Sequence, residues 1–170
     1  MHNDYRKKVM NCELKNQPPA KNLPDLEWDN DLALYAQLLA NECAFRSING
    51  FVSKYQHVGQ NQAMFPTIKE AVNSWFEEYT DYDFDTQNCT SVCGNYIQMV
   101  WQNTTKVGCG VKDCSQQLGY PIKSVNCYYS EAAIWPGQRP YETKSQSECP
   151  NKPASVGTAP GTTVTATTST

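Results

Sequence analysis

Eight cysteines spread over the whole chain constrain this sequence most strongly. An even and dispersed set is typical of a protein crosslinked by disulfides. Zinc sites instead favour tight pairs such as C-x2-C followed by a second pair, and the two tightest pairs here have different spacings. Disulfides are therefore favoured over a metal cluster, and their pairing is open at this point. The set is Cys12, Cys43, Cys89, Cys93, Cys109, Cys114, Cys127 and Cys149.

Two N-glycosylation sequons agree with an oxidising, secretory route. Asn88 begins Asn-Cys-Thr and Asn103 begins Asn-Thr-Thr, and N-glycosylation occurs in the same pathway that forms disulfides. Met1 runs straight into a polar, basic segment without a signal peptide, so we interpret the chain as a mature protein with an added start methionine. We expect a secreted, extracellular protein with glycans on Asn88 and Asn103.

The charge balance and the hydrophobic content exclude several classes of protein. With 17 acidic and 14 basic side chains the formal net charge is -3, which excludes a strongly cationic nucleic-acid or membrane-surface protein. The chain is too apolar to be disordered, and no run approaches the roughly 18 apolar residues of a membrane span. We expect one monomeric domain over residues 1–150. The Thr/Ser-rich residues 151–170 are expected to form a flexible tail, either O-glycosylated or a plain linker.

Apolar residues at helical spacing predict two helices in the first 45 residues. In the opening segment Tyr5, Val9 and Cys12 share one face. A clearer stripe follows Asp29 and runs from Leu32 to Cys43 at i, i+3, i+4, i+7, i+8 and i+11. Both stripes are expected to face the core.

A third helix is predicted to begin at Thr67, where Thr67 and Glu70 form a capping box. At about 100° per residue, Glu78 lies at the edge of its apolar stripe and can face a cleft, whereas Glu77 points to water. The stripe consists of Ile68, Ala71, Val72, Trp75, Phe76 and Tyr79.

The second half of the chain has the character of strands. Residues 106–112 and 123–129 are short alternating runs separated by turn-rich residues, which predicts an antiparallel hairpin. Helices first and strands later indicate an α+β layered domain rather than a parallel α/β fold.

The sequence offers little for catalysis. His2 and His57 are its two histidines, and neither lies near a serine-hydrolase signature. Chemistry of the Cys-His type needs a free thiolate, whereas these cysteines are expected to be oxidised. A glycosidase would need a pair of carboxylates, and the cluster Asp81, Asp83 and Asp85 could supply one. We favour the alternative that this cluster is a solvated acidic loop. We expect no enzyme and no cofactor.

Four strings resemble the superfamily of cysteine-rich secretory, antigen 5 and pathogenesis-related proteins, called the CAP or SCP/TAPS superfamily. Residues 94–101 (GNYIQMVW) resemble its G-H-[FY]-T-Q-V-V-W signature, and residues 2–6 resemble its H-N-x-x-R opening. Residues 59–61 are similar to its G-E-N turn, and residues 127–141 to its second signature. The resemblance covers residues 2–150 and is greatest to venom allergen-like proteins of parasitic worms, schistosomes among them.

The resemblance implies a fold and a disulfide pattern. The fold would be a three-layer α-β-α sandwich with an antiparallel sheet. By the family's pairing the bonds would be Cys43–Cys109, Cys89–Cys93 and Cys114–Cys127, with Cys12–Cys149 formed by the two remaining cysteines.

Many members hold a divalent cation in a central cavity with two His and two Glu, and this sequence departs from that set. The equivalent positions are Arg46, Gln60, Glu78 and Asn95, so only Glu78 is retained. A guanidinium cannot ligate a cation, and we expect Glu78 to form an ion pair with Arg46. The resemblance therefore implies no zinc here and no metal site.

Lipid binding recurs in the superfamily in two modes, and both are compatible with this sequence. A sterol can lie under the mobile loop after the first signature, here residues 101–120, and a fatty acid can lie between two long helices. The same apolar residues can also simply form the core, as periodic stripes usually do. The sterol candidates are Met99, Val100, Trp101, Val107, Val111 and Tyr120, and the acyl candidates are Tyr5, Val9, Ile68, Val72, Trp75 and Phe76.

These observations predict a non-catalytic extracellular protein that binds hydrophobic small molecules, sterols or fatty acids. The alternative is an interaction module that binds a host extracellular protein through exposed loops, with any lipid incidental.

Overall fold

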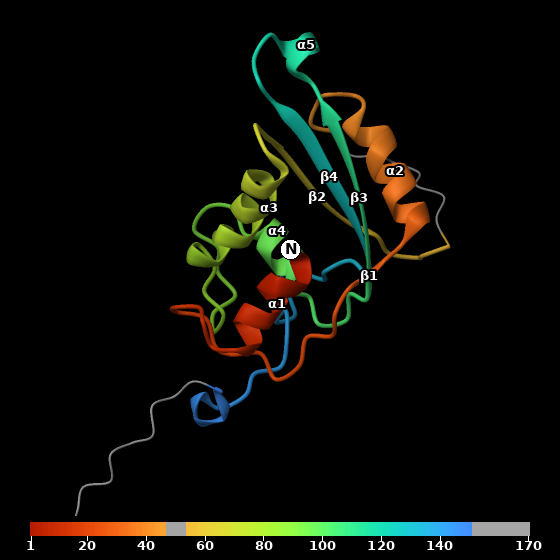
Figure 1. The fold of residues 1–170 in the computed structure, drawn as a ribbon. Coiled ribbons are helices and arrows are strands. Elements are labelled where there is room, and N and C mark those ends of the chain that lie inside the picture. Colours follow the sequence, from red (N-terminus) through yellow and green to blue (C-terminus); the bar gives the residue numbers. More distant parts are fainter. Residues whose placement is uncertain (47–53, 151–170) are drawn as a thin grey trace, which may run out of the picture.

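A sheet of four strands forms the middle layer of the protein (Figure 1). The computed structural model describes residues 1–46 and 54–150. The strands are β1 (Glu27–Trp28), β2 (Gly59–Phe65), β3 (Lys106–Asp113) and β4 (Lys123–Ser130), in the order β1-β3-β4-β2. The predicted antiparallel hairpin is confirmed as β3 and β4, and β2 joins β4 antiparallel. Strand β1 pairs parallel with β3, so the sheet is mixed and not wholly antiparallel as expected.

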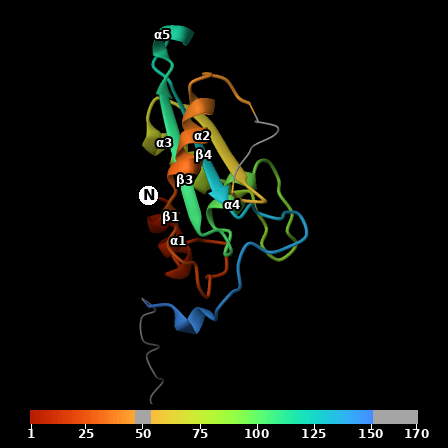
Figure 2. The same cartoon turned by 90° about the vertical axis from the view of Figure 1, so that its right-hand side faces the viewer.

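Helices cover both faces of this sheet, which confirms the predicted three-layer α-β-α sandwich (Figures 1 and 2). On one face α2 (Asn30–Ala40) packs against β3 and β4. On the other face lie α1 (His2–Met10), α3 (Ile68–Glu77) and α4 (Gly94–Met99). Three short elements complete the fold: η1 (Glu78–Thr80), α5 (Ser115–Leu118) and η2 (Gln146–Glu148).

Helix α2 begins at Asp29 and lies unusually close to the sheet. The Asp29 carboxylate caps the helix, accepting hydrogen bonds from the backbone N–H groups of Asp31 and Leu32 at 3.0 Å each. Two glycines of β3 lie directly under the helix, and a Cβ atom added at Gly108 would be 2.1 Å from the Ala33 nitrogen. The helix ends at Ala40, earlier than the apolar stripe, because Cys43 has left the helical conformation with a φ of 51°.

We predict that Asp29→Asn weakens the acid dependence of stability. The hydroxyl of Tyr55, donating at 2.7 Å, the Leu32 N–H and the Lys54 ammonium hold the pKa of Asp29 well below its usual value. The pKa of Asp29 is lower in the folded than in the unfolded protein. Its ionised carboxylate therefore stabilises the fold fully above the unfolded-state pKa of about 3.9, and this stabilisation is lost as the pH falls from there toward the folded-state pKa. Asparagine still caps but carries no charge, so the variant should be about 1 kcal/mol less stable at pH 7.

Urea unfolding at pH 7 and at pH 3 checks this prediction. The difference in free energy of unfolding between the wild-type protein and Asp29→Asn should shrink at pH 3. Asp25 is exposed, so the control variant Asp25→Asn should be as stable as the wild type at both pH values. An undiminished difference at pH 3 would show that the charge of Asp29 is not what stabilises the helix start.

The larger part of the core lies between the sheet and the helices α1, α3 and α4. The predicted capping box opens α3: the Thr67 hydroxyl accepts from the Glu70 N–H at 3.2 Å, and the Glu70 carboxylate accepts from the Thr67 N–H at 3.0 Å. Arg6 of α1 is fully buried here, and its guanidinium donates to the carbonyls of Pro24, Met99 and Trp101. These bonds join α1 to the end of α4 and to the loop before β1.

All eight cysteines form disulfides, and two of the four pairs differ from the expected pattern. The bonds Cys12–Cys149 and Cys89–Cys93 are present as expected. The expected pairs Cys43–Cys109 and Cys114–Cys127 are wrong, because the structure contains Cys43–Cys114 and Cys109–Cys127.

The alternation of side chains along β3 explains this correction. Gly108 and Gly110 face α2, so Cys109 between them points to the opposite face of the sheet. It cannot reach Cys43, which follows α2 on the other side. Instead Cys109 lies directly opposite Cys127 in the β3–β4 register, with their Cα atoms 4.1 Å apart. Cys114, just beyond β3, is then the partner of Cys43.

In the described ranges 1–46 and 54–150, no helix is long and apolar enough to cross a membrane. The expected flexible tail over residues 151–170 lies outside the described residues.

Candidate functional site

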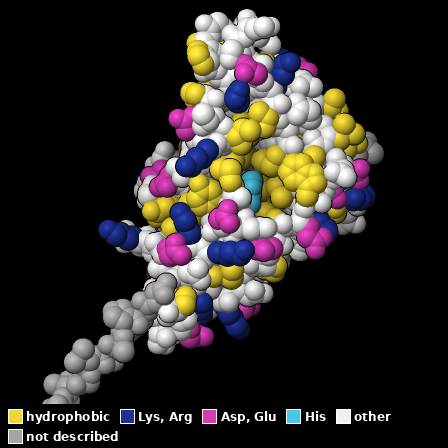
Figure 3. Space-filling model, viewed as in Figure 1, with side chains coloured by type: hydrophobic (Ala, Val, Ile, Leu, Met, Phe, Trp, Pro, Cys, Tyr) yellow, Lys and Arg dark blue, Asp and Glu magenta, His cyan; other side chains and the backbone are white. Residues whose placement is uncertain are grey.

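A hollow of about 240 Å³ lies beside the first turn of α1, between this helix and strands β1 and β3. Figure 3 shows hydrophobic side chains gathered around a hollow on the face that carries α1. At its edge the Trp28 side chain is 59% exposed. We call this site the His2 hollow. Its lining residues are Met1, His2, Asn3, Leu26, Trp28, Val107 and Cys109.

His2 is the main polar group in this lining. Its Nε2 atom lies 2.7 Å from the hydroxyl of Tyr129, which is itself fully buried. Burial, with the positive charges of the N-terminal ammonium and then of Arg6 nearby, lowers the pKa of His2 to about 4, so the imidazole is neutral at pH 7. The amide of Asn3 is already paired with the backbone N–H and carbonyl of Leu26. The His2 hollow is therefore apolar with one neutral polar anchor.

The groove between α1 and α3, expected for an acyl chain, is closed by packing. The Tyr5 ring stacks on Phe76 with the ring centroids 4.2 Å apart, and the Tyr5 hydroxyl donates to Asn73 at 3.0 Å. Of the other candidates, Val9, Val72, Trp75 and Phe76 are buried core residues, whereas Ile68 is exposed at the start of α3. Trp75 nevertheless lies behind the His2 hollow, with its ring centroid 6.5 Å from that of His2.

The segment expected to form a mobile loop over a sterol, residues 101–120, contains strand β3 and helix α5. Met99, Val100 and Trp101 are buried at the end of α4, and Val107 and Val111 point from β3 into the core on the α1 side, Val107 also lining the His2 hollow. Tyr120 is exposed just after α5, at the far end of the hairpin. The structure therefore does not bring the sterol candidates together into one wall.

The four positions of the family's cation site form two hydrogen-bonded pairs, Glu78 with Asn95 and Gln60 with Arg46, which we call the amide cluster. Both Glu78 oxygens accept from Asn95, Oε1 from the side-chain amide at 2.6 Å and Oε2 from the backbone N–H at 2.9 Å. Burial raises the pKa of Glu78 despite these bonds. The Gln60 amide donates to the Arg46 carbonyl at 3.0 Å.

The prediction of an ion pair between Arg46 and Glu78 is wrong, since the ion pairs among the described residues do not include it. The start of α4 already holds the carboxylate, and the Arg46 side chain is exposed. One carboxylate, two amides and a guanidinium do not fit a divalent cation. Within the part of the chain that the structure describes, no group of three or more His, Cys, Asp or Glu converges elsewhere either.

An apolar cleft adjoins this amide cluster. It consists of two neighbouring pockets of about 400 and 430 Å³ that share Ala132, Ala133 and Trp135. Ile134 at its edge is 58% exposed. The buried Gln98 holds the segment in place, since its Oε1 accepts from the Ala133 N–H at 2.8 Å. We call this the Trp135 cleft, and its other lining residues are His57, Val58, Gly59, Gln60, Val92, Gly94, Asn95, Ile97, Gln98, Glu131, Ile134 and Pro136.

Of the apolar residues at the two sites the sequence pointed to Val107, but it did not single out Trp28, Ile134 or Trp135. Trp28 follows no periodic stripe, because β1 has only two residues. Ile134 and Trp135 lie in an irregular segment between the two halves of the second signature, residues 127–129 and 137–141. The sequence did offer one signal for the second site, because Trp135 is an aromatic residue flanked on both sides by residues of the second signature.

The comparisons with known proteins agree with this geometry. The sequence model of the CAP family, described as the cysteine-rich secretory protein family, matches residues 1–129. The solved structure of Schistosoma mansoni venom allergen-like protein 4 superimposes with a TM-score of 0.80 at 38% identity, over 87% of this chain and 93% of that one.

Curated relatives include venom allergen 5 of Rhynchium brunneum, 36% identical over 83% of this chain and 69% of that protein. GLIPR1-like protein 1 of Bos taurus is 35% identical over 83% of this chain and 60% of its own length. The chain thus spans about 60% of the length of the GLIPR1-like relatives of cattle, mouse and human.

Proposed function

The chain belongs to the CAP family of cysteine-rich secretory proteins, and on this premise we propose that it is a secreted, non-catalytic protein that binds hydrophobic small molecules. The observation that carries the proposal is the His2 hollow, an apolar surface depression with one neutral polar anchor. Small-molecule sites commonly combine apolar walls with few polar groups in this way. Four disulfides and relatives named as venom and salivary proteins support secretion.

For the His2 hollow we propose a fatty acid. An acyl chain lying against Leu26, Trp28 and Val107 gains roughly 0.8 kcal/mol for each buried CH2 group. The imidazole of His2 can donate or accept a hydrogen bond at the head group, and Trp75 and Tyr129 support it from behind. The acyl chain would enter the hollow beside α1, so Tyr5 and Phe76 could remain stacked.

For the Trp135 cleft we propose a sterol or another compact lipid with a hydroxyl group. Its combined pockets fall within the roughly 300–1,000 Å³ typical of small-molecule sites. The walls around Ile134 and Trp135 are apolar, whereas Gln60 and Asn95 offer amides to a hydroxyl. This cleft replaces the residue 101–120 segment as our candidate for the sterol mode.

The absence of catalysis is part of the proposal. All eight cysteines are oxidised, so none can act as a thiolate nucleophile. His2 is paired with Tyr129 and has a pKa of about 4, well below that of a general base at neutral pH.

Two matched variants test these assignments. Trp28→Asp and Ile134→Asp each place a charge on an exposed side chain, 59% and 58% exposed, so both should fold. We predict that Trp28→Asp weakens palmitate binding by roughly tenfold or more, because it removes about 1.5–3 kcal/mol of apolar contact. Ile134→Asp should do the same to cholesterol. Labelled ligands titrated into delipidated protein, with circular dichroism as the folding control, give the measurement.

Each variant serves as the control for the other. Equal effects of both variants on both ligands would indicate one shared site, and no effect of either would remove these residues from the lipid sites. Absence of binding by the wild-type protein itself would favour an interaction module for a host extracellular protein.

A further inference from the structure

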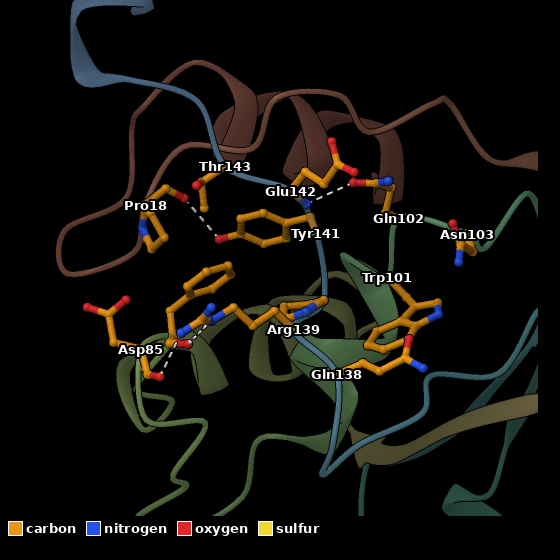
Figure 4. A pocket seen from close by; sticks show the side chains of 12 residues that line it. Pro18, Asp85, Trp101, Gln102, Asn103, Gln138, Arg139, Tyr141, Glu142 and Thr143 are labelled. Carbon is orange, nitrogen blue, oxygen red and sulfur yellow. Dashed lines mark hydrogen bonds between the residues drawn. The ribbon is translucent and has the colours of Figure 1, made fainter.

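A third cleft, of about 650 Å³, shares no lining residue with the sites above and plays no part in the proposed lipid binding. Figure 4 shows it between Arg139 and Tyr141 on one side and Trp101, Gln102 and Asn103 on the other. We call it the Asn103 cleft. Its lining residues are Pro18, Phe84, Asp85, Trp101, Gln102, Asn103, Gln138, Arg139, Pro140, Tyr141, Glu142 and Thr143.

The floor of the Asn103 cleft is rigid and aromatic. Phe84, Trp101 and Tyr141 are all nearly fully buried, so only their edges reach the cleft. The Tyr141 hydroxyl donates to the Pro18 carbonyl at 3.0 Å. The Arg139 guanidinium lies over the Phe84 ring, 5.6 Å from its centroid.

The rim is polar and close to neutral. Arg139 donates to the backbone carbonyls of Phe84 at 3.2 Å and Asp85 at 3.0 Å, so two of its donors are occupied within the protein. The carboxylate of Asp85 balances its charge, and that of Glu142 pairs with the Lys21 ammonium at 3.6 Å. Gln102 and Gln138 add neutral amides that can both donate and accept. Amides beside aromatic edges suit a neutral ligand rich in hydroxyl and acetamide groups better than an anion.

Asn103, a sequon asparagine, is itself one of the residues that line this cleft. Its side chain is exposed and makes no hydrogen bond to any described residue. The neighbouring Thr104 is fully buried and donates to the Glu131 carbonyl at 2.7 Å, which fixes the backbone of the sequon. A sugar attached to Asn103 therefore starts at the edge of the cleft. Asn88, the other sequon asparagine, does not line it.

We propose that the Asn103 cleft holds the first N-acetylglucosamine units of an N-linked glycan attached to Asn103. This inference rests on the N-glycosylation expected for a secreted protein and is independent of lipid binding. The acetamide and hydroxyl groups would pair with the amides of Gln102 and Gln138, and the apolar faces of the sugars would contact the edges of Trp101 and Tyr141 that reach the cleft. The glycan would thereby cover an otherwise open depression.

Site-resolved deglycosylation tests the proposal. Protein from a eukaryotic secretory host is treated under native conditions with a peptide N-glycosidase, and glycopeptide mass spectrometry follows Asn88 and Asn103 separately. Release at Asn103 should be about tenfold slower than at Asn88, since a factor of ten corresponds to about 1.4 kcal/mol of contact. After denaturation and reduction the two rates should be equal.

A pair of amide truncations sharpens the result. Gln138→Ala should speed release of the Asn103 glycan from the native protein, whereas Gln116→Ala, the same change at an exposed position within α5, should not. Equal native release at the two sequons, or an Asn103 that carries no glycan, would overturn the proposal. Neither outcome would bear on the lipid titrations.

Discussion

Replacing Gly108 with alanine is expected to lower the free energy of unfolding by about 3 kcal/mol or more. The added Cβ atom would lie 2.1 Å from the Ala33 nitrogen and 2.5 Å from the Asp29 carbonyl oxygen. Both are backbone atoms of the α2 start, which cannot move as a flexible side chain can. Helix α2 would have to move away from β3, and part of the surface that it now buries against the sheet would become exposed.

Gly94→Ala is the matched control, because a Cβ atom there meets nothing within 4 Å. Alanine in the first turn of α4 should leave stability unchanged or raise it slightly. Chemical denaturation of the two variants measures the difference. If Gly108→Ala were as stable as Gly94→Ala, the close packing of α2 on β3 would be incorrect.

Loss of the Cys12–Cys149 disulfide is expected to cost about 5 kcal/mol. The bond joins residues 137 apart in sequence, so it removes a large amount of conformational entropy from the unfolded chain. It also ties the end of α1 to η2. A Cys12→Ala/Cys149→Ala double variant should therefore unfold at much lower denaturant concentration, although its chain carries every other contact.

The Cys89–Cys93 bond provides the comparison. Its cysteines are four residues apart, so the same reasoning gives only about 2 kcal/mol for Cys89→Ala/Cys93→Ala. Urea midpoints of the two double variants measure both effects. A smaller loss from the long-range pair than from the short-range pair would contradict the entropic account.

Local patterns were sufficient to predict the elements whose signals lie within one segment. Thr67 and Glu70 form the expected capping box, because capping depends on neighbours three residues away, and a helix begins next to Asp29 as predicted. The β3–β4 hairpin was readable from alternation along each strand. Strand β2 was not predicted, because the polar run Gln60–Gln62 becomes a strand only through its pairing with β4.

The disulfide pattern could not be read from the chain, because it depends on which face of β3 each cysteine occupies. A family pairing placed Cys109 with Cys43, yet the alternation about Gly108 and Gly110 turns Cys109 away from α2. The helix that selects this face is distant in sequence. Only the packed structure reveals the constraint.

The candidate site, too, could be predicted only in part from the sequence. Periodicity marked Val72, Trp75 and Phe76 as apolar, and packing then buried them in the core. The exposed apolar residues at which we test the two proposed sites, Trp28 and Ile134, lie outside any periodic stripe. A ligand needs surface that the fold leaves uncovered, and no local pattern reports this.

The central claim, that this CAP protein binds hydrophobic small molecules, is tested most directly by a titration of delipidated, fully oxidised protein with labelled palmitate and labelled cholesterol. A secreted glycoprotein of another family serves as the control. We predict saturable binding, with palmitate binding weakened roughly tenfold or more in Trp28→Asp and cholesterol binding weakened likewise in Ile134→Asp. No saturable binding of either ligand by the wild-type protein would contradict the account.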